Sequence, residues 1–147
     1  YNLKITDMQA AIGLAQLKKL DQFIQQRKDN YQFLYKNLKP LSEYLSLPKP
    51  AKNSDPSWFG FPISVKENLP LNRNEIVQSL NLKNIGTRLL FGGNLTKQPC
   101  YKNTFYRISG TLINTDYVMH NVFWIGVHPS LNCEKIDYIL KVIRSIL

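Results

Sequence analysis

The sequence lacks any apolar run that approaches the roughly 20 residues needed to span a bilayer. It contains only two cysteines, Cys100 and Cys133, which are too few and too far apart for a disulfide framework or a metal-binding knuckle. Its two histidines, His120 and His128, have no nucleophile or metal-ligand arrangement beside them. We therefore expect a protein of the reducing cytoplasm, with no membrane partner and no metal site in this chain.

The chain also lacks an initiating methionine and the hydrophobic segment of a signal peptide, since it opens at Tyr1. Its 147 residues are enough for one domain with a real core, and 44% apolar and 20% charged residues are typical of a globular protein. We expect residues 1–147 to form a single domain cut from a longer protein.

Acidic residues are few: 10 Asp and Glu against 19 Lys and Arg leave a net charge of +9. Such a charge favours an anionic partner, either a nucleic acid or the phosphate groups of a small ligand. The basic residues are scattered along the chain, and no nucleic-acid-binding motif is present. We expect no nucleic-acid partner, while a basic binding module remains the alternative to an enzyme.

A long helix is predicted at the amino-terminal end. Thr6 and Gln9 have the spacing of a capping box, and apolar residues then recur with helical period almost to Pro40. The first half, residues 10–17, is small and apolar nearly all round. We expect residues 1–40 to be an interdomain or interface region, and a fragment that dimerises through this helix is a further alternative.

The rest of the chain alternates short strands and helices. Strands are predicted at 45–47, 58–65, 89–91 and 123–127; Pro62 favours an edge position for the second, and the third is expected to be buried. Helices are predicted after Asn72, after Asn114 or Thr115, and after Asn132. This order predicts an α+β domain with a small, mostly antiparallel sheet covered on one face by helices.

Residues 84–99 are the best candidate for a binding site. Arg88 begins a strand, and Asn94 and Gln98 follow on a loop whose glycines allow a ligand to approach the backbone. A cation and two amides suit a polar, anionic small molecule. The alternative is an ordinary strand followed by a glycine turn.

Three further residues are weaker candidates. Trp58 and Phe59 could form a wall of the site, although aromatic core residues would give the same pattern. His128, between a strand and Pro129, could line a site or be a structural histidine.

Several motifs together resemble a known family. They are Tyr1-Asn2-Leu3-Lys4-Ile5, the run from Met8 to Leu17, Gly86-Thr87-Arg88, Gly93-Asn94-Leu95 with Gln98-Pro99, and the run from Phe123 to Pro129. Over essentially the whole chain the sequence resembles the carboxy-terminal part of the DegT/DnrJ/StrS sugar aminotransferases. It is most similar to their CDP-4-keto-6-deoxyglucose 3-dehydrase branch, because the aminotransferases tend to carry histidine where this chain has Asn94.

The resemblance implies the carboxy-terminal domain of a fold-type-I enzyme that uses pyridoxal or pyridoxamine phosphate. A dehydrase of this branch condenses the cofactor amine with the C4 ketone of a CDP-sugar and expels the C3 hydroxyl, making 3-deoxysugars for lipopolysaccharide O-antigen. It also implies a homodimer, an iron–sulfur (2Fe-2S) cluster and a separate reductase. The catalytic residues and cluster cysteines would then lie upstream of this chain.

Residue by residue, the resemblance places Asn2 at the cofactor phosphate of the neighbouring subunit, and Lys4 where many relatives have arginine. Arg88, Asn94 and Gln98 would face the sugar nucleotide. A pyridoxal-phosphate-dependent sugar-nucleotide aminotransferase of the same family is the alternative activity.

Overall fold

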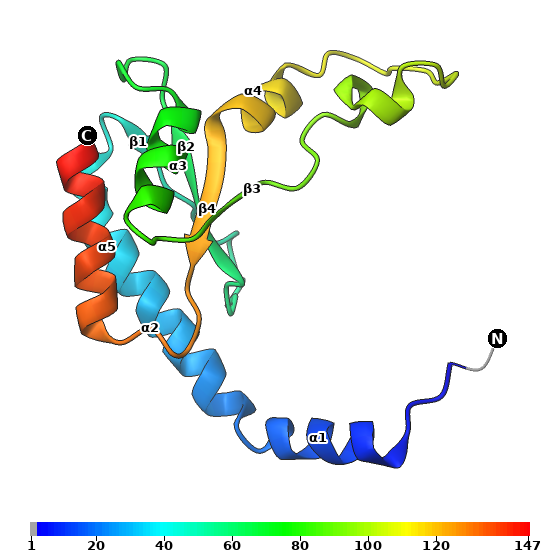
Figure 1. The fold of residues 1–147 in the computed structure, drawn as a ribbon, viewed down its shortest axis with the longest axis vertical. Coiled ribbons are helices and arrows are strands. Elements are labelled where there is room, and N and C mark those ends of the chain that lie inside the picture. Colours follow the sequence, from blue (N-terminus) through cyan, green and yellow to red (C-terminus); the bar gives the residue numbers. More distant parts are fainter. Residues whose placement is uncertain (1–2) are drawn as a thin grey trace.

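The computed structural model describes residues 3–147, so the predicted cofactor residue Asn2 lies outside the described residues. The architecture is a four-stranded antiparallel sheet with helices packed against it (Figure 1). The strand order is β1 (Leu45–Ser46), β2 (Gly60–Val65), β4 (Val122–Gly126), β3 (Thr87–Leu89). The helices are α1 (Asp7–Leu17), α2 (Leu20–Leu38), α3 (Arg73–Leu82), α4 (Ile113–Asn121) and α5 (Cys133–Ile146). The predicted α+β class is confirmed.

The core lies on one face of the sheet, which we call the covered face. Phe61 and Ile63 of β2 sit opposite Ile125 and Phe123 of β4, and all four side chains are buried there. Helices α2 and α5 run side by side over this face, together with α3 (Figure 1). The helix predicted after Asn132 is confirmed as α5, and its buried residues Ile136, Ile139, Leu140 and Ile143 form one apolar stripe.

Three helix starts follow the predicted caps. Thr6 and Gln9 form a reciprocal capping box at α1, and Asn72 and Glu75 form another at α3. The Asn132 side chain accepts from the backbone of α5. The cap predicted at Asn114 or Thr115 is wrong, because α4 begins at Ile113 without a side-chain cap.

The single long amino-terminal helix is also wrong: it is two helices, separated at Lys18 and Lys19. Helix α2 is held by the core from Asn30 onward, whereas α1 has no buried residue within the described chain. Helix α1 therefore need not continue along the axis of α2, and it extends away from the sheet (Figure 1). No helix within residues 3–147 is long and apolar enough to cross a membrane.

Two predictions about strands fail for positional reasons. Strand β2 is interior rather than an edge; Pro62 is tolerated because β1 pairs only with Ser64 and Val65 and ends before reaching it. The strand expected at residues 89–91 to be buried is instead edge strand β3, and the chain leaves the sheet after Leu89. Leu89 is 50% exposed at the end of an edge strand, and Phe91, which lies beyond the strand, is 85% exposed.

The second face of the sheet, which we call the open face, is only partly covered. Helix α4 packs over its far end, where the Tyr117 hydroxyl lies 3.1 Å from Ser64 Oγ and donates to the Val65 carbonyl at 3.2 Å. The end that carries Gly60 and Gly126 is left free of helices among the described residues. The candidate site extends from this end toward α4.

Candidate functional site

The pairing register places three side chains together on the open face. Trp124 of β4 lies opposite Pro62 of β2 on one side and Arg88 of β3 on the other, and directly opposed residues share a face. Arg88 is exposed, and its guanidinium donates to the Thr87 carbonyl at 3.0 Å. The Trp124 indole donates to the Leu89 carbonyl at 3.2 Å, which ties β4 to the end of the edge strand.

Trp124 was not predicted as a site residue, although the sequence holds a signal. It stands between Phe123 and Ile125, both of which are buried on the covered face. Because strand side chains alternate between faces, a large aromatic at the intervening position must lie on the other face. The sequence shows the alternation, but it does not show which face of the sheet stays open.

Aromatic rings surround a shallow hollow of about 180 Å³ beside Trp124. Phe59 is 72% exposed and its ring centroid lies 5.2 Å from that of Trp124. Gly60 allows this arrangement, since a Cβ there would lie 2.3 Å from the Trp124 ring. Trp58 stacks on Tyr31 of α2 at 4.9 Å, so it belongs to the margin of the core while also lining the hollow.

The chain leaves β3 into a compact loop, residues 92–98. Gly93 has φ +62°, a conformation that favours glycine, and a Cβ there would lie 2.5 Å from Met119 of α4. Gln98 folds back to donate to the Gly92 carbonyl at 2.6 Å. The loop is therefore pressed against α4 and closed by its own side chains.

Asn94 is the most buried polar residue of this loop, at 2% exposure. Its Oδ1 accepts from the Thr96 backbone at 3.1 Å and from the Thr96 hydroxyl at 2.7 Å. Its Nδ2 donates to Asp116 Oδ1 at 2.6 Å. The amide predicted to face a ligand is thus engaged within the chain.

Asp116, in the first turn of α4, was missed in the sequence because it lies 22 residues from Asn94. Its other oxygen lies 2.9 Å from Lys97 Nζ. Hydrogen bonds from Asn94 first and Lys97 second hold the pKa of the Asp116 carboxyl below its ordinary value. The group is an anion at neutral pH, paired on both oxygens.

Arg73, the first residue of α3, was also missed. It is 8% exposed and donates to the Met119 carbonyl at 3.2 Å and the Val122 carbonyl at 3.3 Å. These carbonyls lie at the carboxy-terminal end of α4, where the helix dipole favours a cation. Burial lowers the pKa of the guanidinium, which nevertheless stays charged at neutral pH. Arg73 therefore holds the far end of the helix on which the loop rests.

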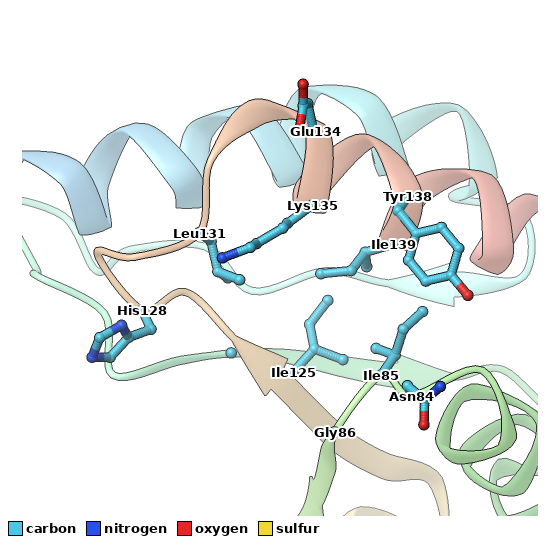
Figure 2. A pocket seen from close by; sticks show the side chains of 11 residues that line it. Asn84, Ile85, Gly86, Ile125, His128, Leu131, Glu134, Lys135, Tyr138 and Ile139 are labelled. Atoms are coloured by element: carbon cyan, nitrogen blue, oxygen red, sulfur yellow. The ribbon is translucent and has the colours of Figure 1, made fainter.

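His128 lies elsewhere. It lines a larger cavity of about 480 Å³ between α5 and the segment entering β3, together with Ile125 of the covered face (Figure 2). Its ring is turned away from the apolar side chains, and Nδ1 accepts from the Ser130 backbone at 3.1 Å. The predicted residues are thus divided among separate hollows. Trp58 and Phe59 line the one beside Trp124, and Gln98 lines another beside Met119. Arg88 lines a third against α3, and His128 lines the cavity beside α5.

Of the two predicted cofactor residues, only Lys4 lies in the described part of the chain, exposed and just before α1. One ammonium is a point charge and cannot cradle a phosphate by itself. Lys4 by itself therefore does not form a phosphate site among the described residues.

A four-stranded antiparallel sheet with helices packed against it is a fold that the chain shares with solved structures of sugar-modifying enzymes. A structure of E. coli GDP-4-keto-6-deoxy-D-mannose-3-dehydratase with bound hydrated PLP superposes with a TM-score of 0.86 at 30% identity, covering 97% of this chain and 36% of that one. An aminotransferase from Brucella abortus, at 20% identity, shares the fold with a TM-score of 0.81 over 97% of this chain and 36% of that one.

The family model of the DegT/DnrJ/EryC1/StrS aminotransferases matches residues 1–144, and the chain belongs to this family. It is 53% identical over 141 residues to the lipopolysaccharide biosynthesis protein RfbH of Salmonella typhimurium, covering 96% of this chain and 32% of that protein. It is 44% identical over 145 residues to the dTDP-4-dehydro-2,6-dideoxy-D-glucose 3-dehydratase of Saccharopolyspora spinosa, covering 99% and 31%. The chain therefore spans about a third of the length of these relatives, and the resemblance seen in the motifs is confirmed.

Proposed function

We propose that this chain is the substrate-side, carboxy-terminal domain of a pyridoxamine-phosphate-dependent sugar-nucleotide 3-dehydrase. One observation carries the proposal: the chain is 44% identical to a sugar-nucleotide 3-dehydratase but only 28% identical to the dTDP-4-amino-4,6-dideoxy-D-glucose transaminase of Shigella dysenteriae. Both comparisons extend over 145 residues, so the difference does not come from a single motif.

The finer proposal is a CDP-4-keto-6-deoxyglucose substrate, a 3-deoxysugar product for lipopolysaccharide O-antigen, and a cytoplasmic homodimer. The similarity to RfbH supports the lipopolysaccharide part. The 2Fe-2S cluster and the separate reductase rest on the motif resemblance. The part of the protein upstream of this chain would bind them. The pyridoxamine phosphate, when bound, supplies the electron sink for loss of the C3 hydroxyl.

The described residues would bind and orient the sugar nucleotide. Arg88 offers an exposed side chain on edge strand β3, beside a hollow of about 650 Å³ against α3, and its guanidinium is suited to the oxygens of a diphosphate. The loop that carries Asn94 and Gln98 would border the sugar, and Phe59 with Trp58 would form an aromatic wall. His128, which lines the separate cavity beside α5, is also a proposed substrate-binding residue.

Lys4 and Asn2 would contribute to the cofactor phosphate of the neighbouring subunit. The exposure of α1 is consistent with residues 1–40 forming an interface. Leu3, Ile12 and Leu17 are all exposed, and no residue of α1 is buried against the described chain. An apolar helix of this kind is expected to pack on the rest of the protein or on the second subunit.

The test is the visible absorption spectrum of the full-length protein, purified without added cofactor and then given pyridoxal phosphate. We expect a brown iron–sulfur spectrum and no stable yellow lysine-bound cofactor. A yellow protein without a cluster would instead identify the aminotransferase, the activity of the relative at 28% identity.

If neither signal is seen, the basic binding module returns to consideration. Steeply salt-dependent binding to random DNA would then support it, because neutralising phosphates releases counterions. Tight binding of CDP-sugars without affinity for DNA would exclude it.

A further inference from the structure

Three side chains join the 92–98 loop to helix α4, and we call them the clamp: Asn94, Lys97 and Asp116. Asn94 is buried, although Gly92 and Leu95 on either side of it are exposed. Both acceptor positions of its amide oxygen are occupied by Thr96. Its amide nitrogen points to Asp116, so the side chain faces the helix and not the open face.

Asp116 completes the clamp from the helix side. Its two oxygens are divided between the two ends of the loop, one 2.6 Å from Asn94 Nδ2 and the other 2.9 Å from Lys97 Nζ. Charge-assisted hydrogen bonds of this kind are about twice as strong as neutral ones. The carboxylate therefore sets the distance between the loop and the first turn of α4.

Helix α4 is itself fixed to α3 at its carboxy-terminal end and to the sheet at its middle. Arg73 holds the carbonyls of Met119 and Val122 at that end, and the Tyr117 hydroxyl donates to the Val65 carbonyl from the middle. Helix α4 thus fixes the position of the loop relative to β2 and α3. A change at the clamp would move the loop relative to Arg88 on β3.

We propose that Asn94 and Asp116 are positioning residues, which hold the 92–98 loop in place beside the substrate site without contacting the substrate. This inference rests on the proposed function for its kinetic consequence but not for its structural one. The loop's substrate-facing groups are then Gln98 and the glycine-rich backbone, whose position depends on the clamp.

The experiment exchanges the two clamp residues in the full-length holoenzyme. Asn94→Asp places a second carboxylate against Asp116, and the like charges repel. The double variant Asn94→Asp/Asp116→Asn restores one amide facing one carboxylate, with Lys97 still beside them. Asn114→Asp, on an exposed residue of α4, makes the same chemical change outside the clamp and serves as the control.

Two readouts are measured: kcat and KM with CDP-4-keto-6-deoxyglucose, and amide hydrogen exchange of residues 90–99. We expect Asn94→Asp to lower kcat/KM by about 10- to 100-fold and to speed exchange in the loop. The double variant should recover to within about threefold of the wild type in both readouts, a difference worth under about 0.7 kcal/mol. Asn114→Asp should change neither.

If the amide of Asn94 contacted the substrate directly, the double variant would stay as impaired as Asn94→Asp while its loop regained protection, and the proposal would be overturned. Unchanged exchange in Asn94→Asp would also overturn it. Should the double variant not fold, Asp116→Ala decides: faster loop exchange supports the clamp, and wild-type exchange refutes it. Because exchange needs no substrate, the clamp can stand even if the sugar-nucleotide activity is absent.

Discussion

The two faces of the sheet are built from the same strands and yet differ in almost every respect. On the covered face, Phe61, Ile63, Phe123 and Ile125 are closed under α2, α3 and α5. On the open face the intervening positions hold Pro62, Trp124 and, on β3, Arg88. Many apolar contacts hold the covered face together, whereas the open face depends on a few specific contacts. The comparison predicts that damage on the first face is a loss of stability and damage on the second is a loss of binding.

The largest effect is expected from Phe123→Ala on the covered face. Removing a fully buried ring leaves a cavity, and we expect the free energy of unfolding to fall by about 3–5 kcal/mol. Denaturant unfolding of the full-length protein measures it. Trp124→Ala, the neighbour on the open face, is the matched control and should cost clearly less. Equal losses would mean that the two faces are equally part of the core.

A smaller loss is expected from Gly60→Ala, which brings a Cβ within 2.3 Å of the Trp124 ring. Displacing that ring should cost about 1–3 kcal/mol through overpacking. Gly126 lies opposite Gly60 in the register, and a Cβ added there would meet no atom within 4 Å, so Gly126→Ala is the control. Thermal unfolding of both variants distinguishes them, and equal melting temperatures would show that Trp124 moves freely.

Arg88→Ala tests the open face as a binding surface. Losing a guanidinium that faces a diphosphate should weaken sugar-nucleotide binding by about tenfold, with the melting temperature unchanged. Calorimetric titration of the full-length protein with the CDP-sugar measures the affinity. Lys141→Ala, an exposed cation on α5, controls for net charge. Undiminished affinity in Arg88→Ala would remove that residue from the site.

The smallest effect is a pH dependence confined to acid. The pKa of Asp116 is lowered in the folded protein, so its contribution to stability is present above the unfolded pKa and is lost as pH falls through the folded value. We expect the stability difference between wild type and Asp116→Asn to be constant from about pH 8 to 5 and to shrink below about pH 4. A difference that changes near pH 7 would contradict the assignment.

Local features were predictable because their partners lie within a few residues. The caps at Thr6, Asn72 and Asn132 need only a side chain and a backbone amide two or three positions away. The helical stripe of α5 and the alternation along β2 follow from backbone period alone. Of the candidate site, Arg88 and Gln98 stay predictions, made from their place beside glycines in the same stretch.

Features that depend on neighbours distant in the chain were not predictable. The break between α1 and α2 falls at exposed residues, and β2 is interior because β1 and β4 pair on either side of it. The pairing of Asn94 with Asp116 spans 22 residues, and that of Arg73 with the Val122 carbonyl spans 49. No local pattern records which loop a helix will meet.

The sequence by itself determined the fold class and most of the elements, the side-chain period on each, the net charge and, through its motifs, the family. Only the tertiary structure decided which face of the sheet is closed, that Phe91 is exposed and not core, and that Asn94 faces a helix. The physical reason is that periodicity and capping are short-range properties of the chain. Burial and polar pairing are set by the sheet order and by the helices that pack upon it.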